Sequence, residues 1–219
     1  DLIERSGLRG RSGGGYPTGL KWKQALQTPA NARFLICNAK ESDPGSFSDK
    51  TVLESDPHRL IEGMAIAAYA IGASNAILYL KSGSDHAHKR VQRAIDLARE
   101  YGIIGHNIYS SGYNLDITIR VEAGAFVCGE ETALINSLEG KRGMPQLKPP
   151  YPTTYGLSGK PTVINNVETI MNVPLIMQNG PEWFRSFGTE KSPGTKIFSI
   201  TGRGRMSGVV EVEMGTTLK

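Results

Sequence analysis

Short apolar or alternating runs are separated by helical segments along this chain, and this pattern limits the possible folds more than any other feature. The runs lie at residues 33–38, 76–80 and 115–121, with helical periodicity at 57–71 and 86–101 between them. A short, nearly continuous apolar run is typical of a strand buried on both faces. Strands separated by helices predict parallel βαβ units. We therefore expect an α/β fold with a Rossmann-like parallel sheet flanked by helices.

Further elements are expected before and after these units. Their ranges are 2–6, 130–139, 167–178 and 181–187 for helices and 162–164 for a strand. Residues 140–152 are too rich in proline for a helix or strand. We expect a rigid crossing there, with Lys148 held out from it.

The pattern changes near Ser192. Residues 196–201 and 209–212 alternate as the two strands of a hairpin. We place one α/β domain at residues 1–191 and the start of a second, incomplete domain at 192–219. Because the chain begins inside a helix and ends soon after a strand, we expect a piece of a longer protein.

Composition excludes several classes of partner. The net charge of +4 comes without a block of Lys and Arg, so it does not favour nucleic acid. Cys37 and Cys128 form no CxxC pattern, which argues against a metal site or a disulfide scaffold. Two unpaired cysteines suit a reducing compartment, which we expect to be the cytoplasm or the cytoplasmic or matrix side of a membrane complex. No secretory signal is visible. The longest apolar run, residues 64–73, is much shorter than the roughly 20 residues that a membrane span needs.

Residues 10–22 concentrate glycine, which costs roughly 0.5–1 kcal/mol relative to alanine inside regular structure. Consecutive glycine N–H groups form nests that bind anions. Arg11 and Lys21 add positive charge, and Tyr16 offers a stacking face. A flexible linker is the alternative, and neither GxGxxG nor GxxxxGK followed by Ser or Thr occurs here. We expect a loop that touches phosphate or a large flat ligand.

Polar turns follow the first and third apolar runs. Since the carboxyl ends of parallel strands meet at one edge of a sheet, we expect residues 38–43 to lie near residues 122–131. Carboxylates of the first turn, Glu41 and Asp43, would accept hydrogen bonds from ribose hydroxyl or ring N–H groups. The glycine-rich residues 123–129 would let a ligand approach the backbone before Glu130 and Glu131.

Each of these turns also has a purely structural explanation. Residues 41–43 would form a solvated turn, and acids within 129–132 would be favoured by a helix dipole by about 0.3–1 kcal/mol. The asparagines at 165–166 would be ordinary helix N-caps. The residues themselves leave both explanations open. The four histidines show no metal spacing and are expected at the surface.

Taken together, these stretches resemble one family, the NADH-binding flavoprotein subunit of respiratory complex I. The diaphorase subunits of NAD-linked hydrogenases and formate dehydrogenases share it. A subunit of sodium-pumping ferredoxin:NAD oxidoreductases shares fewer of the motifs. The matching residues are 7–11, 13–22, 37–39, 43–45, 129–143, 148–150 and 163–169.

The resemblance implies an NAD(P)H dehydrogenase of diaphorase type, with FMN and NAD(H) as cofactors. Hydride would pass directly between nicotinamide and flavin without a catalytic side chain. Implied FMN-binding residues are Gly10, Arg11, Gly13, Lys21, Asn38, Lys40, Glu130, Asn165, Asn166 and Thr169. Implied NAD-binding residues are Gly13, Gly14, Tyr16, Asp43, Glu131 and Lys148.

The resemblance also implies partners. Electrons would leave to iron–sulfur clusters of a multi-subunit redox complex, a thioredoxin-like [2Fe-2S] subunit among them. The family's own [4Fe-4S] cluster would lie in a C-terminal part absent here, so neither cysteine should be a ligand. The second domain beginning at Ser192 would be a β-grasp domain.

Three residues depart from the family pattern: Lys40 in place of aspartate, Gln24 in place of a second aromatic, and Phe126 in place of tyrosine. One hypothesis puts Lys40 near the flavin, where it stabilises the anionic reduced form and raises the potential. The other turns Lys40 toward solvent. The departures also motivate an alternative function, a flavin-free pseudo-subunit that acts as a docking module.

Overall fold

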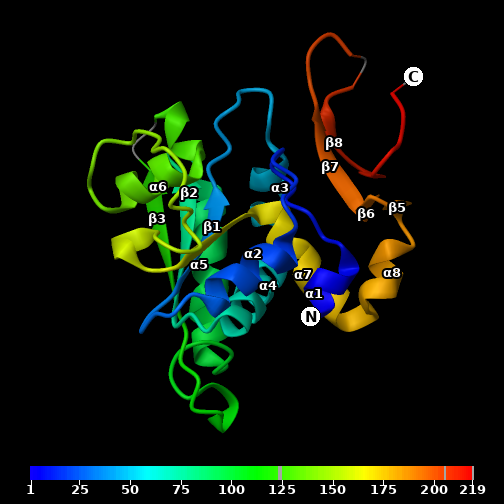
Figure 1. The fold of residues 1–219 in the computed structure, drawn as a ribbon. Helices are drawn as coiled ribbons and strands as arrows, with labels where there is room; N and C mark the ends of the chain where they lie inside the picture. Colours follow the sequence, from blue (N-terminus) through cyan, green and yellow to red (C-terminus); the bar gives the residue numbers. More distant parts are fainter. Residues whose placement is uncertain (123–124, 205, 219) are drawn as a thin grey trace.

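The computed structural model describes residues 1–122, 125–204 and 206–218. Its central sheet has four parallel strands in the order β3-β2-β1-β4. Figure 1 labels β3, β2 and β1 of this sheet side by side. The strands are β1 (Phe34–Ala39), β2 (Asn75–Lys81), β3 (Asp116–Glu122) and β4 (Thr162–Asn166). The predicted α/β fold with a parallel sheet is confirmed.

Strand β1 is buried on both faces, which explains its continuous apolar sequence. Leu35 and Cys37 point into a large core made with the helices on one face of the sheet, while Ile36 points into a smaller core on the other. All three side chains are fully buried. A strand in the middle of a sheet with helices on both faces has no polar side to present.

Eight α-helices occur within the described ranges. They are α1 (Leu2–Ser6), α2 (Thr18–Gln27), α3 (Ser48–Ser55), α4 (Pro57–Ile71), α5 (Asp85–Glu100), α6 (Glu131–Leu138), α7 (Val167–Asn179) and α8 (Pro181–Arg185). Short 3-10 turns lie at η1 (Ile108–Ser110), η2 (Phe126–Gly129) and η3 (Leu157–Gly159). Gly7 and Gly72 end α1 and α4 in the left-handed conformation, as the sequence predicts. No helix among the described residues is long and apolar enough to cross a membrane.

Two helices depart from the sequence predictions. The loop expected over residues 10–22 is wrong from Thr18 onward, because α2 begins there and buries Trp22 and Ala25 in the large core. Helix α3 was not predicted at all. Its only fully buried residue is Leu53, so its sequence carries almost no helical apolar pattern.

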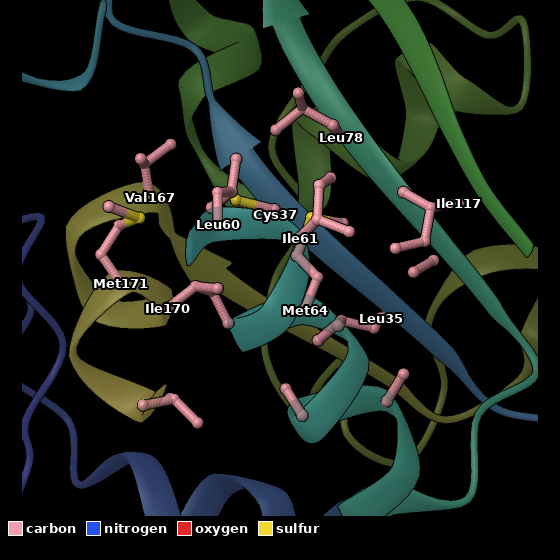
Figure 2. Close-up of a cluster of buried hydrophobic side chains, with 14 of the residues drawn as sticks. Leu35, Cys37, Leu60, Ile61, Met64, Leu78, Ile117, Val167, Ile170 and Met171 are labelled. Atoms are coloured by element: carbon pink, nitrogen blue, oxygen red, sulfur yellow. The ribbon is translucent and has the colours of Figure 1, made fainter. Parts of the chain in front are cut away.

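Helix α4 lies at the centre of the large core. Figure 2 shows Leu60 and Met64 of α4 between the sheet and Ile170 of α7. Gly63 lets the two helices approach closely, since a Cβ added there would stand 2.4 Å from the carbonyl oxygen of Ile170. Helix α7 begins at the end of β4, so this packing also sets where the edge of the sheet lies relative to the helix.

The chain ends in small antiparallel pairs, β5 (Gly188–Thr189) with β6 (Ser192–Pro193) and β7 (Thr195–Ile200) with β8 (Gly208–Glu213). The predicted hairpin is confirmed, and Figure 1 shows it beside the segment that follows β1. Glu168 in the first turn of α7 anchors it, because its carboxylate accepts a hydrogen bond from Ile197 N–H at 2.7 Å and pairs with Lys196. The domain boundary near Ser192 stays a prediction.

Substituting Gly63→Ala should lower the free energy of unfolding by about 1–3 kcal/mol, because the new methyl group collides with the backbone of α7. Urea denaturation would measure the change. The exposed neighbour in the same helix, Glu62→Ala, is the matched control and should change stability little. Equal midpoints for Gly63→Ala and wild type would contradict the close packing.

Candidate functional site

The carboxyl ends of β1 and β4 lie side by side at one edge of the sheet. From β1 the sheet continues through β2 and β3 in one direction and to β4 in the other, so strand order reverses between β1 and β4. In this pairing Asn38 stands opposite Asn166, and Cys37 opposite Asn165. Ligands of open α/β sheets bind at such switch points. The sheet therefore selects this edge as the candidate site.

The glycine loop, residues 10–17, is fixed at its base over this edge. Gly10 N–H donates to the carbonyl of Tyr16 at 2.9 Å, which closes the loop. Arg11 N–H donates to Thr169 Oγ1 at 2.9 Å and ties the loop to the first turn of α7. The Arg11 guanidinium is buried and donates to the carbonyl of Pro193 at 2.7 Å. The side chain of Arg11 therefore holds the loop against the end of the chain.

The tip of the loop leaves its backbone open. Gly13 and Gly15 adopt φ of 109° and 60°, which favour glycine. A Cβ at Gly13, Gly14 or Gly15 would meet nothing within 4 Å, so these residues face open space. Within the part of the chain that the structure describes, no protein acceptor is bonded to the N–H groups of Gly13 and Gly14. This backbone offers donors of the kind that bind phosphate.

The start of α6 faces the loop from the other side. Glu130 is its N-cap, and its carboxylate accepts hydrogen bonds from the N–H groups of Thr132 at 2.8 Å and Ala133 at 3.0 Å. Lys148 adds an ion pair at 3.0 Å. Burial alone would raise the pKa of Glu130, but these hydrogen bonds outweigh it and leave the pKa below its ordinary value. Glu130 is therefore a fixed anion.

Lys148 and Lys21 both reach Glu131. Lys148 Nζ lies 2.6 Å from Oε1 of Glu131, and Lys21 Nζ lies 3.5 Å from Oε2. Lys21 also donates to the carbonyl of Ile164 in β4 at 3.0 Å. The side chain of Lys148 extends from the crossing, as predicted, and its ammonium group reaches the two acids at the start of α6. Residues 140–152 otherwise contain no helix or strand, as predicted.

Two adjoining hollows lie at this edge. The first hollow measures about 620 Å³ and lies between the glycine loop, the end of β4 and Tyr151 to Thr153. The second hollow measures about 680 Å³ and lies between the loop, the segment after β1 and Lys196 of the hairpin. Both hollows are lined by Ser12, Asn38, Gly129, Glu130 and Asn166.

Most of the residues predicted to bind cofactors line one of these hollows. The first hollow collects Gly10, Gly14, Tyr16, Lys21, Asn38, Glu130, Glu131, Asn165 and Asn166. The second hollow collects Arg11, Gly13, Asn38, Lys40, Asp43, Glu130 and Asn166. Thr169 lines neither, because it is buried behind the loop, and Lys148 is joined to the site through its ion pairs. The expected proximity of residues 38–43 to residues 122–131 is confirmed, although residues 123 and 124 lie outside the described ranges.

Each asparagine of β4 has a defined partner. Asn165 Oδ1 accepts a hydrogen bond from the Trp22 indole at 2.8 Å, which joins α2 to the strand. Asn166 caps α7 through the N–H of Glu168 at 3.0 Å and donates to Asp49 at 2.7 Å. The N-cap explanation therefore holds for Asn166, and both residues also line the first hollow.

Lys40 is buried with Glu122. Its Nζ lies 2.5 Å from Glu122 Oε2, and the two side chains are 1% and 2% exposed. The hypothesis that Lys40 turns toward solvent is wrong, because the aliphatic part of its side chain lies under Gly129 and its charge is paired. Lys40 also lines the second hollow.

Asp49 lines the second hollow and was missed by the sequence analysis. Burial, followed by the nearby Glu41 carboxylate, raises its pKa from 3.8 to about 7. Asp49 lies in the first turn of α3, where the helix dipole alone is a sufficient reason for an acidic residue. The signal that marks it as unusual is tertiary, since the burial that raises its pKa comes from packing against other segments, and Asn166 of β4 lies 2.7 Å away. Among the described residues, no group of three or more His, Cys, Asp or Glu could hold a metal ion.

A parallel sheet with a switch-point edge, an open glycine loop and two joined hollows define a nucleotide-binding α/β domain. Residues 3–175 match the protein family described as the Nuo51 FMN-binding domain. The chain belongs to this family, as the sequence motifs indicate.

Individual relatives agree with this assignment. The chain is 52% identical to the NADP-reducing hydrogenase subunit HndC of Solidesulfovibrio fructosivorans, over all of this chain and 44% of that protein. It is 51% identical to an NADH-quinone oxidoreductase subunit of Aquifex aeolicus, over all of this chain and 51% of that protein. A solved NAD+-reducing [NiFe]-hydrogenase in the H2-reduced state superposes with a TM-score of 0.92 and 42% identity, over 98% of this chain and 36% of that one. The chain spans about half the length of the curated relatives it matches.

The raised pKa of Asp49 predicts a specific pH dependence. Between about pH 4 and pH 7 the folded protein retains a proton that the unfolded chain has lost, so the free energy of unfolding falls as pH rises. Asp49→Asn removes this contribution. The variant should therefore gain stability relative to wild type over that range, and the gain should level off above about pH 7.

Urea unfolding at pH 4.5 and pH 7.5 would measure this difference. Asp85→Asn, at an exposed acid in the first turn of α5, is the matched control and should follow the wild-type pH dependence. A constant difference between Asp49→Asn and wild type at the two pH values would refute the raised pKa.

Proposed function

We propose that this chain forms the site where FMN and NAD(P)H meet and exchange a hydride. One observation carries the proposal: two hollows of about 620 and 680 Å³ adjoin at the switch point and share five lining residues. Each volume falls within the roughly 300–1,000 Å³ range of ligand sites. Adjoining hollows suit two ligands that must touch, as a hydride donor and acceptor do.

The lining residues fit FMN. A phosphate needs several donors, and the open N–H groups of Gly13 and Gly14 and the ammonium group of Lys21 supply them. Because the residues at the loop tip are glycines, a phosphate could approach their backbone closely. Asn38, Asn166 and Glu130 would contact the flavin from the shared wall of the two hollows.

The rim fits a dinucleotide. Tyr16 is 43% exposed and lines the first hollow, where a base could stack on its ring. Gln24 donates to the hydroxyl of Tyr16 at 2.8 Å and so orients that ring, in place of a second aromatic. Glu131 and Asp43 would accept ribose hydroxyl groups, and Lys148 would approach the phosphates.

The protein's part in the reaction is positional. Bound FMN supplies the hydride acceptor, and no side-chain acid or base is required for that transfer. Glu130 accepts hydrogen bonds from the first turn of α6, and Asn38 donates one to the carbonyl of Gly129. These bonds fix the shared wall, so that both rings would be held in contact.

We place this activity in a larger redox complex. Membership of the family and the naming of relatives as hydrogenase and quinone oxidoreductase subunits support electron transfer to iron–sulfur clusters. A thioredoxin-like [2Fe-2S] subunit is the proposed partner, and a [4Fe-4S] cluster is proposed outside this chain. The buried free thiols Cys37 and Cys128 favour a reducing, cytoplasmic location.

FMN and NADH titrations test the proposal on the full-length protein. We expect FMN fluorescence to be quenched on binding and the flavin absorbance to bleach when NADH is added under anaerobic conditions. A protein that stays colourless with excess FMN would reject this function and favour the flavin-free docking module.

Tyr16→Ala should raise the dissociation constant for NADH roughly tenfold, because stacking of a base on an aromatic ring is worth about 1–3 kcal/mol. The affinity for FMN should change less than about twofold. Tyr101→Ala, at an exposed tyrosine that lines neither hollow, is the control. If both variants bind NADH like wild type, Tyr16 is not the stacking platform.

A further inference from the structure

The buried pair of Lys40 and Glu122 joins two strands that are not neighbours. Lys40 follows the last residue of β1, and Glu122 is the last residue of β3, with β2 between them. Strands two places apart in a sheet are about 9–10 Å from each other. The long side chains of lysine and glutamate bridge that gap, and their charged atoms meet at 2.5 Å. The pair therefore spans the end of β2.

Hydrogen bonds extend this pair into the wall of the site. Glu122 Oε1 accepts from Ala125 N–H at 2.7 Å, where η2 begins. At the other end of η2, the carbonyl of Gly129 accepts from the Asn38 amide at 3.0 Å. The same Asn38 side chain accepts from Lys40 N–H at 3.0 Å. One end of residues 125–129 is therefore joined to Lys40 through Glu122, and the other end is joined directly to Asn38.

The tied segment leads directly into the shared wall of the two hollows. Gly129 and Glu130 line both hollows, and Glu130 caps α6. A Cβ on Gly129 would lie 3.9 Å from Lys40 Cγ, so the lysine stem packs beneath this glycine. A shift of Lys40 or Glu122 would move the start of α6 relative to the ends of β1 and β4.

We infer that Lys40 and Glu122 act as a neutral buried clamp that positions Gly129 and Glu130 for cofactor binding. Lys40 is therefore a positioning residue, and it does not present an uncompensated positive charge to the flavin. This inference rests on the proposed function for the identity of the cofactor. The clamp itself follows from the pairing, the burial and the hydrogen bonds of the two side chains.

Buried ion pairs have a distinctive response to mutation. Removing one partner leaves the other charge buried without compensation, whereas removing both leaves no charge and is often tolerated. A clamp therefore predicts strong non-additivity between the two positions. A lysine acting on the flavin through its charge predicts instead that every variant lacking the lysine behaves alike.

The test compares Lys40→Met, Glu122→Gln and the double variant in the full-length protein. FMN affinity is measured by fluorescence quenching, and thermal unfolding is followed without FMN. We expect each single substitution to weaken FMN binding at least tenfold and to lower the melting temperature. The double variant should bind within about threefold of wild type, melt above both single variants and keep the wild-type FMN midpoint potential. Lys50→Met, at an exposed lysine that pairs with Glu54 across one helical turn, is the control and should change nothing.

The clamp would be refuted if the double variant bound FMN no more tightly, and melted at no higher temperature, than the more impaired of the two single variants. A midpoint potential that falls equally in Lys40→Met and in the double variant would also refute it. Single variants that fail to fold beside a double variant that folds would support it. If wild type binds no FMN, the proposed function fails, and the melting temperatures of the same four proteins still decide whether the pair is a clamp.

Discussion

The candidate site depends on the double pairing of β1, with β2 on one side and β4 on the other. This pairing sets the ends of β1 and β4 side by side, so the polar groups that follow the two strands collect at one edge of the sheet. Close packing of α4 on α7 at Gly63 then fixes the position of α7, the helix that Asn166 caps. The glycine loop is attached to that helix through Thr169, so its position follows from the same core.

Charges at this edge neutralise one another within the protein. Lys148 and Lys21 are shared by the acids that begin α6, Lys196 is paired with Glu168, and Lys40 with Glu122. Pairing of this kind avoids isolated charges in partly buried positions, which are costly. The backbone N–H groups of the loop tip and the ring of Tyr16 carry no charge and are open to a ligand. The site thus depends on shape and hydrogen bonding more than on net charge.

Local sequence signals predicted the sheet, most helices and the collection of polar turns at one edge, because periodicity and glycine stops report local structure. They failed at α3, where Leu53 is the only fully buried residue of the helix. They also failed at the start of α2, because the glycine-rich sequence before it predicted a loop, whereas the burial of Trp22 stabilises a helix there. The family resemblance singled out Lys40, but its ion-pair partner, Glu122, lies at the end of β3, far along the chain. Asp49 was missed for the same reason, since its neighbours belong to other elements.

Amide hydrogen exchange of the full-length protein, measured with and without FMN, shows whether the flavin binds at the edge where β1 and β4 end. If the flavin binds at the switch point between β1 and β4, exchange should slow at residues 12–16, 129–133 and 165–169. The surface around Tyr101 and Tyr109, on loops that line neither hollow, should keep its rate. Slowed exchange confined to segments outside these three, in a protein that binds FMN, would contradict the account.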